Sequence, residues 1–98
     1  MKINITARKF KARETLKDFI KDEISSLERF SDDIIEVDVI LSFQNQKENI
    51  KSAEIIVRIP EHTLTATEDG EEFEYSVRKC TEKMISQLKK IKTKKIKH

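Results

Sequence analysis

The 98-residue sequence has few of the residues that build catalytic and cofactor sites. Its two histidines, His62 and His98, do not stand at the spacing of a metal-binding motif. Its single cysteine, Cys80, excludes an internal disulfide and falls on an apolar stripe, which predicts a buried thiol. Its single glycine excludes a glycine-rich phosphate-binding loop, because such a loop needs several glycines. We therefore expect a protein without catalytic activity, metal or cofactor.

Long apolar segments are also missing from the sequence. No apolar run approaches the roughly 20 residues that a membrane-spanning helix requires, and the first ten residues do not resemble a signal peptide. We expect a cytoplasmic chain with neither a membrane nor a small molecule as its partner. The length predicts a single domain over residues 1–98, since a chain of this size builds one modest core.

Aromatic side chains are scarce, with five phenylalanines, one tyrosine and no tryptophan. Phe19, Phe30, Phe43 and Phe73 fall at positions expected in the core, and Tyr75 falls outside that pattern. Proteins that bind single-stranded nucleic acid stack its bases on exposed aromatic rings. The sequence therefore excludes a base-stacking platform, and a nucleic-acid partner is expected to be bound through its phosphates and its shape.

Charge, by contrast, is abundant and unevenly distributed. Charged residues make up 39% of the chain, the formal net charge is +2, and the last ten residues contain six lysines and no acid. A second basic segment covers residues 8–21. Such separation of charge is typical of nucleic-acid-binding proteins, although a solubilising tail on an ordinary domain gives the same composition. We expect a basic tail from about residue 93 that is disordered until it binds RNA.

Hydrophobic periodicity divides the chain into six elements. Apolar residues alternate in four segments that we expect to be strands, namely 2–7, 35–44, 51–59 and 63–68. They recur every three or four residues in two segments that we expect to be helices, namely 13–30 and 71 to about 92. Ile35 and Phe43 are expected to point into the core, and 45–49 and Asp69-Gly70 are expected to form turns. The order predicts an α+β fold of two layers, β-α-β-β-β-α, with both helices on one face of a four-stranded sheet.

Short strings spread in order over nearly the whole chain carry a family resemblance. They are Ile3-Asn4-Ile5-Thr6, Leu16 with Asp18-Phe19, Leu27-Glu28, Val37, Val39, Leu41, Ala66, Glu68, Gly70, Lys83-Met84, Gln87-Leu88, Lys90, Lys92 and Lys94. In this order they are similar to the short ribosome hibernation promoting factors and ribosome-associated inhibitor A. The chain departs from that pattern early in the second helix, where Arg78 stands in place of an acidic residue.

The resemblance implies a fold like that of double-stranded-RNA-binding domains, bound to the small ribosomal subunit. It implies a translation inhibitor that blocks the channel for messenger and transfer RNA and favours inactive ribosomes, with basic side chains of both helices facing ribosomal RNA. The candidate RNA-binding residues are Lys17, Lys21, Lys79, Lys83, Lys89, Lys90, Lys92 and Lys94. The free protein is expected to be a monomer. The alternative is a general duplex-RNA-binding or protein-interaction module with the same architecture.

Overall fold

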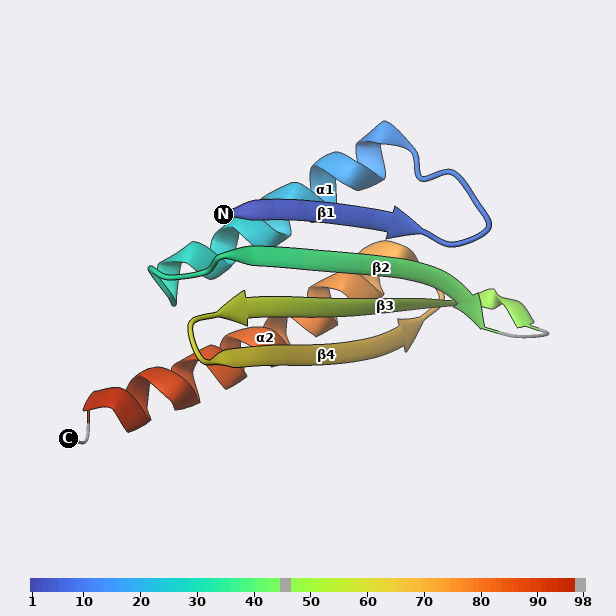
Figure 1. The fold of residues 1–98 in the computed structure, drawn as a ribbon. Helices are drawn as coiled ribbons and strands as arrows, with labels where there is room; N and C mark the ends of the chain where they lie inside the picture. Colours follow the sequence, from blue (N-terminus) through green and yellow to red (C-terminus); the bar gives the residue numbers. More distant parts are fainter. Residues whose placement is uncertain (45–46, 97–98) are drawn as a thin grey trace.

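The structure is a two-layer α+β fold with both helices on one face of a four-stranded sheet (Figure 1). This computed structural model describes the backbone of residues 1–44 and 47–96 and the side chains of residues 1–44 and 50–92. The strands are β1 (Lys2–Ala7), β2 (Glu36–Gln44), β3 (Lys47–Ile59) and β4 (His62–Gly70). The helices are α1 (Glu14–Ser25), continued by the short 3-10 helix η1 (Ser26–Arg29), and α2 (Phe73–Ile96). The predicted fold class is therefore confirmed.

The strands lie in the order β1-β2-β3-β4. Strand β1 pairs with β2 in parallel, so α1 is the crossover between them, and β2, β3 and β4 form an antiparallel meander. A two-residue turn at Pro60 and Glu61 joins β3 to β4, and Glu61 adopts a positive φ of 70°. These connections leave β1 and β4 as the two edges of the sheet.

The core lies between the sheet and the two helices. Alternate residues of β2 and β3 are fully buried on the helix-facing side, and the predicted helical stripes pack against them. The largest fully buried side chains are Ile20, Ile24, Leu27, Leu41, Ile55, Met84, Val37, Val39, Val57, Val77 and Cys80. The periodicity of the sequence thus predicted the buried face of every large element.

Three local predictions about β2 and β3 are wrong. Ile35 is 59% exposed, because β2 begins one residue later and Ile34 is turned into the core instead. Phe43 is 38% exposed, since it lies at the end of β2 beside a register shift, although its ring still contacts two other phenylalanines. Strand β3 begins at Lys47, inside the segment expected to be a loop.

The sole glycine belongs to β4 and not to a turn. A Cβ atom at Gly70 would lie 2.5 Å from the Tyr75 ring and 3.0 Å from Ser76 Oγ. Ser76 is buried, and its hydroxyl donates a hydrogen bond of 2.7 Å to the carbonyl oxygen of Lys51 in β3. Gly70 therefore allows the first turn of α2 to approach the end of the sheet closely.

Helix α2 extends beyond the sheet at its C-terminal end (Figure 1). The molecule is elongated, with principal extents of 48 × 22 × 18 Å. Helix α2 continues to Ile96, so the backbone of residues 93–96 is helical where the sequence predicted a disordered tail. Within the described residues, no helix is long and apolar enough to cross a membrane.

Candidate nucleic-acid interface

The candidate lysines of α2 lie on two sides of the helix, with the apolar stripe between them. Lys83 contacts β4, and Lys90 follows it by two helical turns on the same side. Lys89 lies on the side of α1, with its ammonium 5.3 Å from the centre of the Phe30 ring. Lys92 is on that side too, where it lines a pocket together with Phe30. The lysines of the sequence motif therefore do not form one continuous surface.

Two of the candidate lysines of α2 are engaged by acids of the same chain. Lys83 forms an ion pair with Glu68 and donates a hydrogen bond of 3.0 Å to the carbonyl oxygen of Thr67. The hydrogen bond to Glu68 raises the pKa of Lys83 above its ordinary value. Lys79 lies 3.6 Å from Glu82 and 5.7 Å from the centre of the Tyr75 ring. Part of the charge of both lysines is therefore neutralised within the protein.

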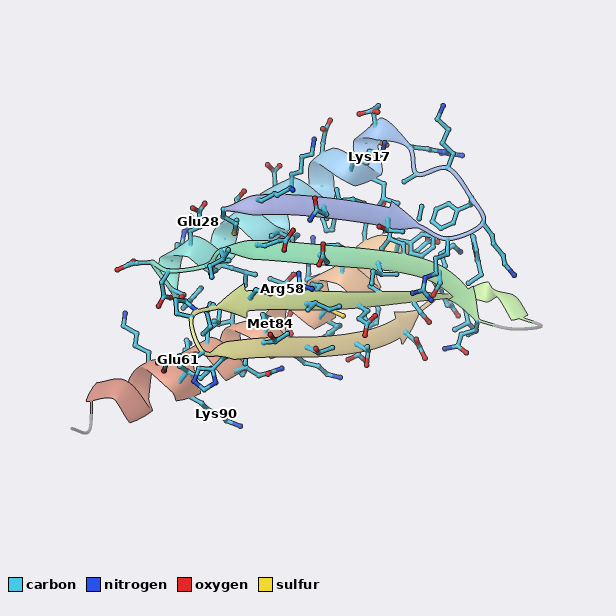
Figure 2. The ribbon with its side chains drawn as sticks, in the orientation of Figure 1. Lys17, Glu28, Arg58, Glu61, Met84 and Lys90 are labelled. Atoms are coloured by element: carbon cyan, nitrogen blue, oxygen red, sulfur yellow. The ribbon has the colours of Figure 1, made fainter. Side chains whose placement is uncertain are left out.

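Other candidate lysines differ in how far their charge is neutralised within the protein. Lys21, Lys90 and Lys92 have no acid within ion-pair distance among the residues whose side chains are described. Lys17 lies near the beginning of α1 (Figure 2), and its ammonium is 3.8 Å from the exposed Glu14 carboxylate. Lys94 has a helical backbone, but its side chain lies outside the described residues. The strongest unneutralised charge on α2 is thus in its last described turns.

A cation that the sequence analysis did not select lies between the two helices. Arg78 places its guanidinium 5.4 Å from the centre of the Phe19 ring and 4.0 Å from the Glu23 carboxylate. Lys89 lies over Phe30 in the same way. Lys89 follows Arg78 by 11 positions in α2, and Phe30 follows Phe19 by 11 positions in the chain. Such contacts hold a cation over a ring while leaving it accessible. Only the departure at Arg78 from the family pattern signalled this arrangement.

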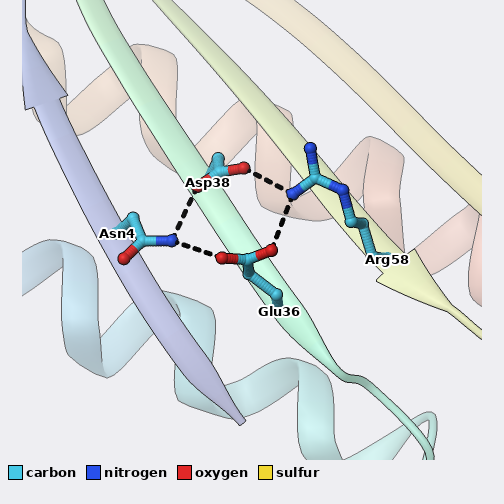
Figure 3. A network of polar contacts seen from close by, with 4 residues as sticks. All are labelled: Asn4, Glu36, Asp38 and Arg58. Carbon is cyan, nitrogen blue, oxygen red and sulfur yellow. Dashed lines mark hydrogen bonds and ion pairs between the residues drawn. The ribbon is translucent and has the colours of Figure 1, made fainter.

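The opposite face of the sheet carries a compact polar network. Asn4, Glu36, Asp38 and Arg58 join β1, β2 and β3 through four hydrogen bonds of 2.7–2.9 Å (Figure 3). Hydrogen bonds from Arg58 and then Asn4 lower the pKa of Asp38 below its ordinary value. Because these groups satisfy one another across neighbouring strands, they stabilise the sheet and do not form a separate binding site.

The structure offers no arrangement of residues for nucleophilic or metal chemistry among its described side chains. No group of three or more histidine, cysteine, aspartate or glutamate residues could hold a metal ion in this part of the chain. Cys80 is fully buried, as predicted, and burial raises the pKa of its thiol to about 12. A thiol with that pKa is not a nucleophile near neutral pH. The residues that remain as functional candidates are therefore exposed cations.

Comparisons with known proteins match nearly the whole chain. A family model described as "Sigma 54 modulation protein / S30EA ribosomal protein" matches residues 3–96. A ribosome hibernation promoting factor from Azotobacter vinelandii is 28% identical over 96 residues, which cover 98% of this chain and 87% of that protein.

Two solved structures share the fold. The N-terminal domain of Protein Y from Thermus thermophilus matches with a TM-score of 0.82 and 20% identity, over 93% of this chain and 99% of that chain. A ribosomal subunit interface protein from Coxiella burnetii matches with a TM-score of 0.86 and 19% identity, over 95% and 99%. Since the family model covers nearly the whole chain, the resemblance seen in the sequence is confirmed, and the protein belongs to the Sigma 54 modulation protein / S30EA ribosomal protein family.

Proposed function

We propose that this protein is a ribosome hibernation factor that binds the small ribosomal subunit and blocks the channel for messenger and transfer RNA. Membership of the family and the name of the relative from Azotobacter vinelandii support a role on the ribosome. The observation that carries the proposal concerns Lys90 (Figure 2) and Lys92 in the last described turns of α2, which are exposed and have no acid partner among the described side chains.

Lysine is suited to binding RNA without reading its sequence. Its ammonium is a mobile point charge that neutralises a phosphate and releases a counterion. Lys90 and Lys92 can do this at once, since neither has an acid partner among the described side chains. Specificity for one site on the ribosome then comes from the shape of an RNA-lined cleft.

Inhibition requires only occupancy in this mechanism. A rigid body of 48 × 22 × 18 Å within the channel excludes messenger and transfer RNA by its volume. No covalent step and no cofactor take part. When free, the protein is a monomer in the cytoplasm. Its release from the ribosome leaves the ribosome unchanged.

Sedimentation with purified small subunits tests the proposal. The protein should pellet with the subunits at near-stoichiometric ratio and should not be displaced by a large excess of generic duplex RNA. Displacement by generic duplex would favour the alternative, a general duplex-RNA-binding module. Sucrose gradients of stationary-phase cells with and without the protein should show a larger inactive ribosome fraction when it is present.

A further inference from the structure

The connection between β1 and α1 is a strongly basic loop that the proposed interface does not include. It has the sequence Arg8-Lys9-Phe10-Lys11-Ala12-Arg13, with four cations and no acid. All four charged side chains are exposed. None has an acid within ion-pair distance among the described residues, in contrast to Lys79 and Lys83 of α2.

The loop is held in one conformation by an aromatic cluster. The Phe10 ring stacks on Phe73 with a centroid distance of 5.0 Å and an interplanar angle of 9°, and it meets Phe43 edge-on at 5.1 Å. On either side of this anchor, the Arg8 amide donates a hydrogen bond of 2.9 Å to the Leu41 carbonyl oxygen, and Ala12 is buried. Cations on such a loop bind a ligand with little further loss of backbone entropy.

The backbone of the loop also adopts an unusual conformation. Lys9 adopts a φ of 63°, in the left-handed region that non-glycine residues rarely occupy. The contacts of Phe10 and Ala12 are what hold this conformation, and it presents the Lys9 side chain to solvent. A loop that served only to connect β1 to α1 would need neither the anchor nor four cations.

The loop and the basic end of α2 lie at opposite ends of the elongated molecule (Figure 1). A ligand bound by both ends must therefore present phosphates at two separated places on a rigid frame. Folded ribosomal RNA has that property, whereas a short RNA hairpin contacts one end at a time. Two attachment points on one rigid body also raise the overall affinity through the effective concentration of the second.

We propose that the loop of residues 8–13 is a second phosphate-binding site, which anchors the end of the protein remote from the tip of α2 to RNA. This inference rests on the proposed function, since it takes ribosomal RNA as the ligand. Arg8 and Arg13 supply planar donors that pair with phosphate oxygens in a bidentate manner, and Lys9 and Lys11 supply point charges between them.

A pair of charge-matched double variants tests the second site. Lys9→Asn with Lys11→Gln removes two loop cations, with asparagine chosen at position 9 because it tolerates a positive φ. Lys2→Gln with Arg29→Gln removes the same charge from exposed positions outside the loop. The loop variant should bind small subunits at least fivefold more weakly than the control variant.

The salt dependence of binding gives the same test a second readout. Loss of two phosphate contacts should reduce the slope of log affinity against log salt by about 1.4–1.8, while the control slope should not change. Equal affinity and equal slope for the two variants would overturn the second site and leave the proposed function intact. Failure of the unchanged protein to bind small subunits would overturn both.

A crosslinking measurement identifies the partner of the loop without relying on loss of binding. Lys11→Cys can be labelled selectively with a photoreactive group, because Cys80 is fully buried. Crosslinks from position 11 to ribosomal RNA are expected. Crosslinks to a ribosomal protein alone, or none in a complex that has formed, would overturn the assignment of RNA as the ligand. If the double loop variant fails to fold, the Lys11→Cys crosslinks still show whether the loop contacts RNA.

Discussion

Lys83 of α2 is paired with Glu68 of the edge strand β4, and its ammonium also donates to the carbonyl oxygen of Thr67. Gln87, one turn later, donates a hydrogen bond of 2.9 Å to the carbonyl oxygen of Thr65. Two side chains of α2 thus cover outward-facing carbonyl groups of β4. Exposed edges of this kind pair readily with other strands, so these contacts protect the β4 edge from such pairing.

This pairing predicts a structural role for Lys83. Lys83→Gln should lower the midpoint of thermal unfolding more than Lys90→Gln, because Lys83 loses an ion pair and a hydrogen bond whereas Lys90 has no acid partner among the described side chains. Differential scanning calorimetry of the two variants makes the comparison. Indistinguishable midpoints would mean that the Lys83–Glu68 pair contributes nothing to stability.

The polar network on the open face of the sheet predicts a dependence of stability on pH. The pKa of Asp38 is lowered in the folded state, so its contribution is fully present above the unfolded value of about 4 and is lost as pH falls through the folded pKa. Asp38→Asn should therefore be less stable than the unchanged protein at pH 7, and this difference should shrink below about pH 4. Chemical denaturation at pH 7, 4 and 3 measures it. A difference that stayed constant over this range would exclude Asp38 as the titrating group.

The core near the end of α2 predicts that replacing its apolar side chains by alanine costs less stability toward the tip of the helix. Leu88 is 2% exposed, and Leu88→Ala should lower the free energy of unfolding by about 2–5 kcal/mol. Ile91, one turn later, is only partly buried, so Ile91→Ala should cost clearly less. Urea denaturation of both variants tests the order. A larger loss at Ile91 would contradict the packing of this end of the helix.

The burial of Cys80 predicts that its thiol reacts slowly with thiol reagents. Cys80 donates to the carbonyl oxygen of Ala53 at 3.2 Å and its pKa is raised to about 12, so a thiol reagent should react only when the protein unfolds. Reaction rates should rise with denaturant in parallel with unfolding. Cys80→Ser should destabilise only moderately, because the Ala53 oxygen offers its hydroxyl a partner. Rapid labelling of the native protein would show that the thiol is accessible.

The sequence predicted most of the fold because periodicity reports burial directly. Val77, Cys80, Met84 and Leu88 all lie in the core where their spacing placed them. The alternation failed at Ile35, because a period of two shows which residues share a face but not where pairing with the neighbouring strand begins. The last helical turn, at residues 93–96, was missed for a similar reason, since it adds no apolar stripe that a sequence pattern could detect.

The candidate interface was predicted less completely. Spacing of lysines cannot reveal which of them meet an acid from another element, as Lys83 meets Glu68 in the fold. The basic run of residues 8–13 was visible in the sequence, but its rigidity depends on Phe10 meeting Phe43 and Phe73 from distant elements. Burial follows from local patterns, whereas the availability of a charge depends on tertiary contacts.

The most direct test of the proposed function compares two pairs of lysines on the same helix. Lys90→Gln with Lys92→Gln and Lys79→Gln with Lys83→Gln remove equal charge, but the second pair is already engaged by Glu82 and Glu68. Equilibrium binding to purified small subunits should fall at least tenfold for the first variant, about 1.4 kcal/mol, and less than threefold for the second. Unchanged binding by the Lys90/Lys92 variant, with native-like thermal unfolding, would contradict the account.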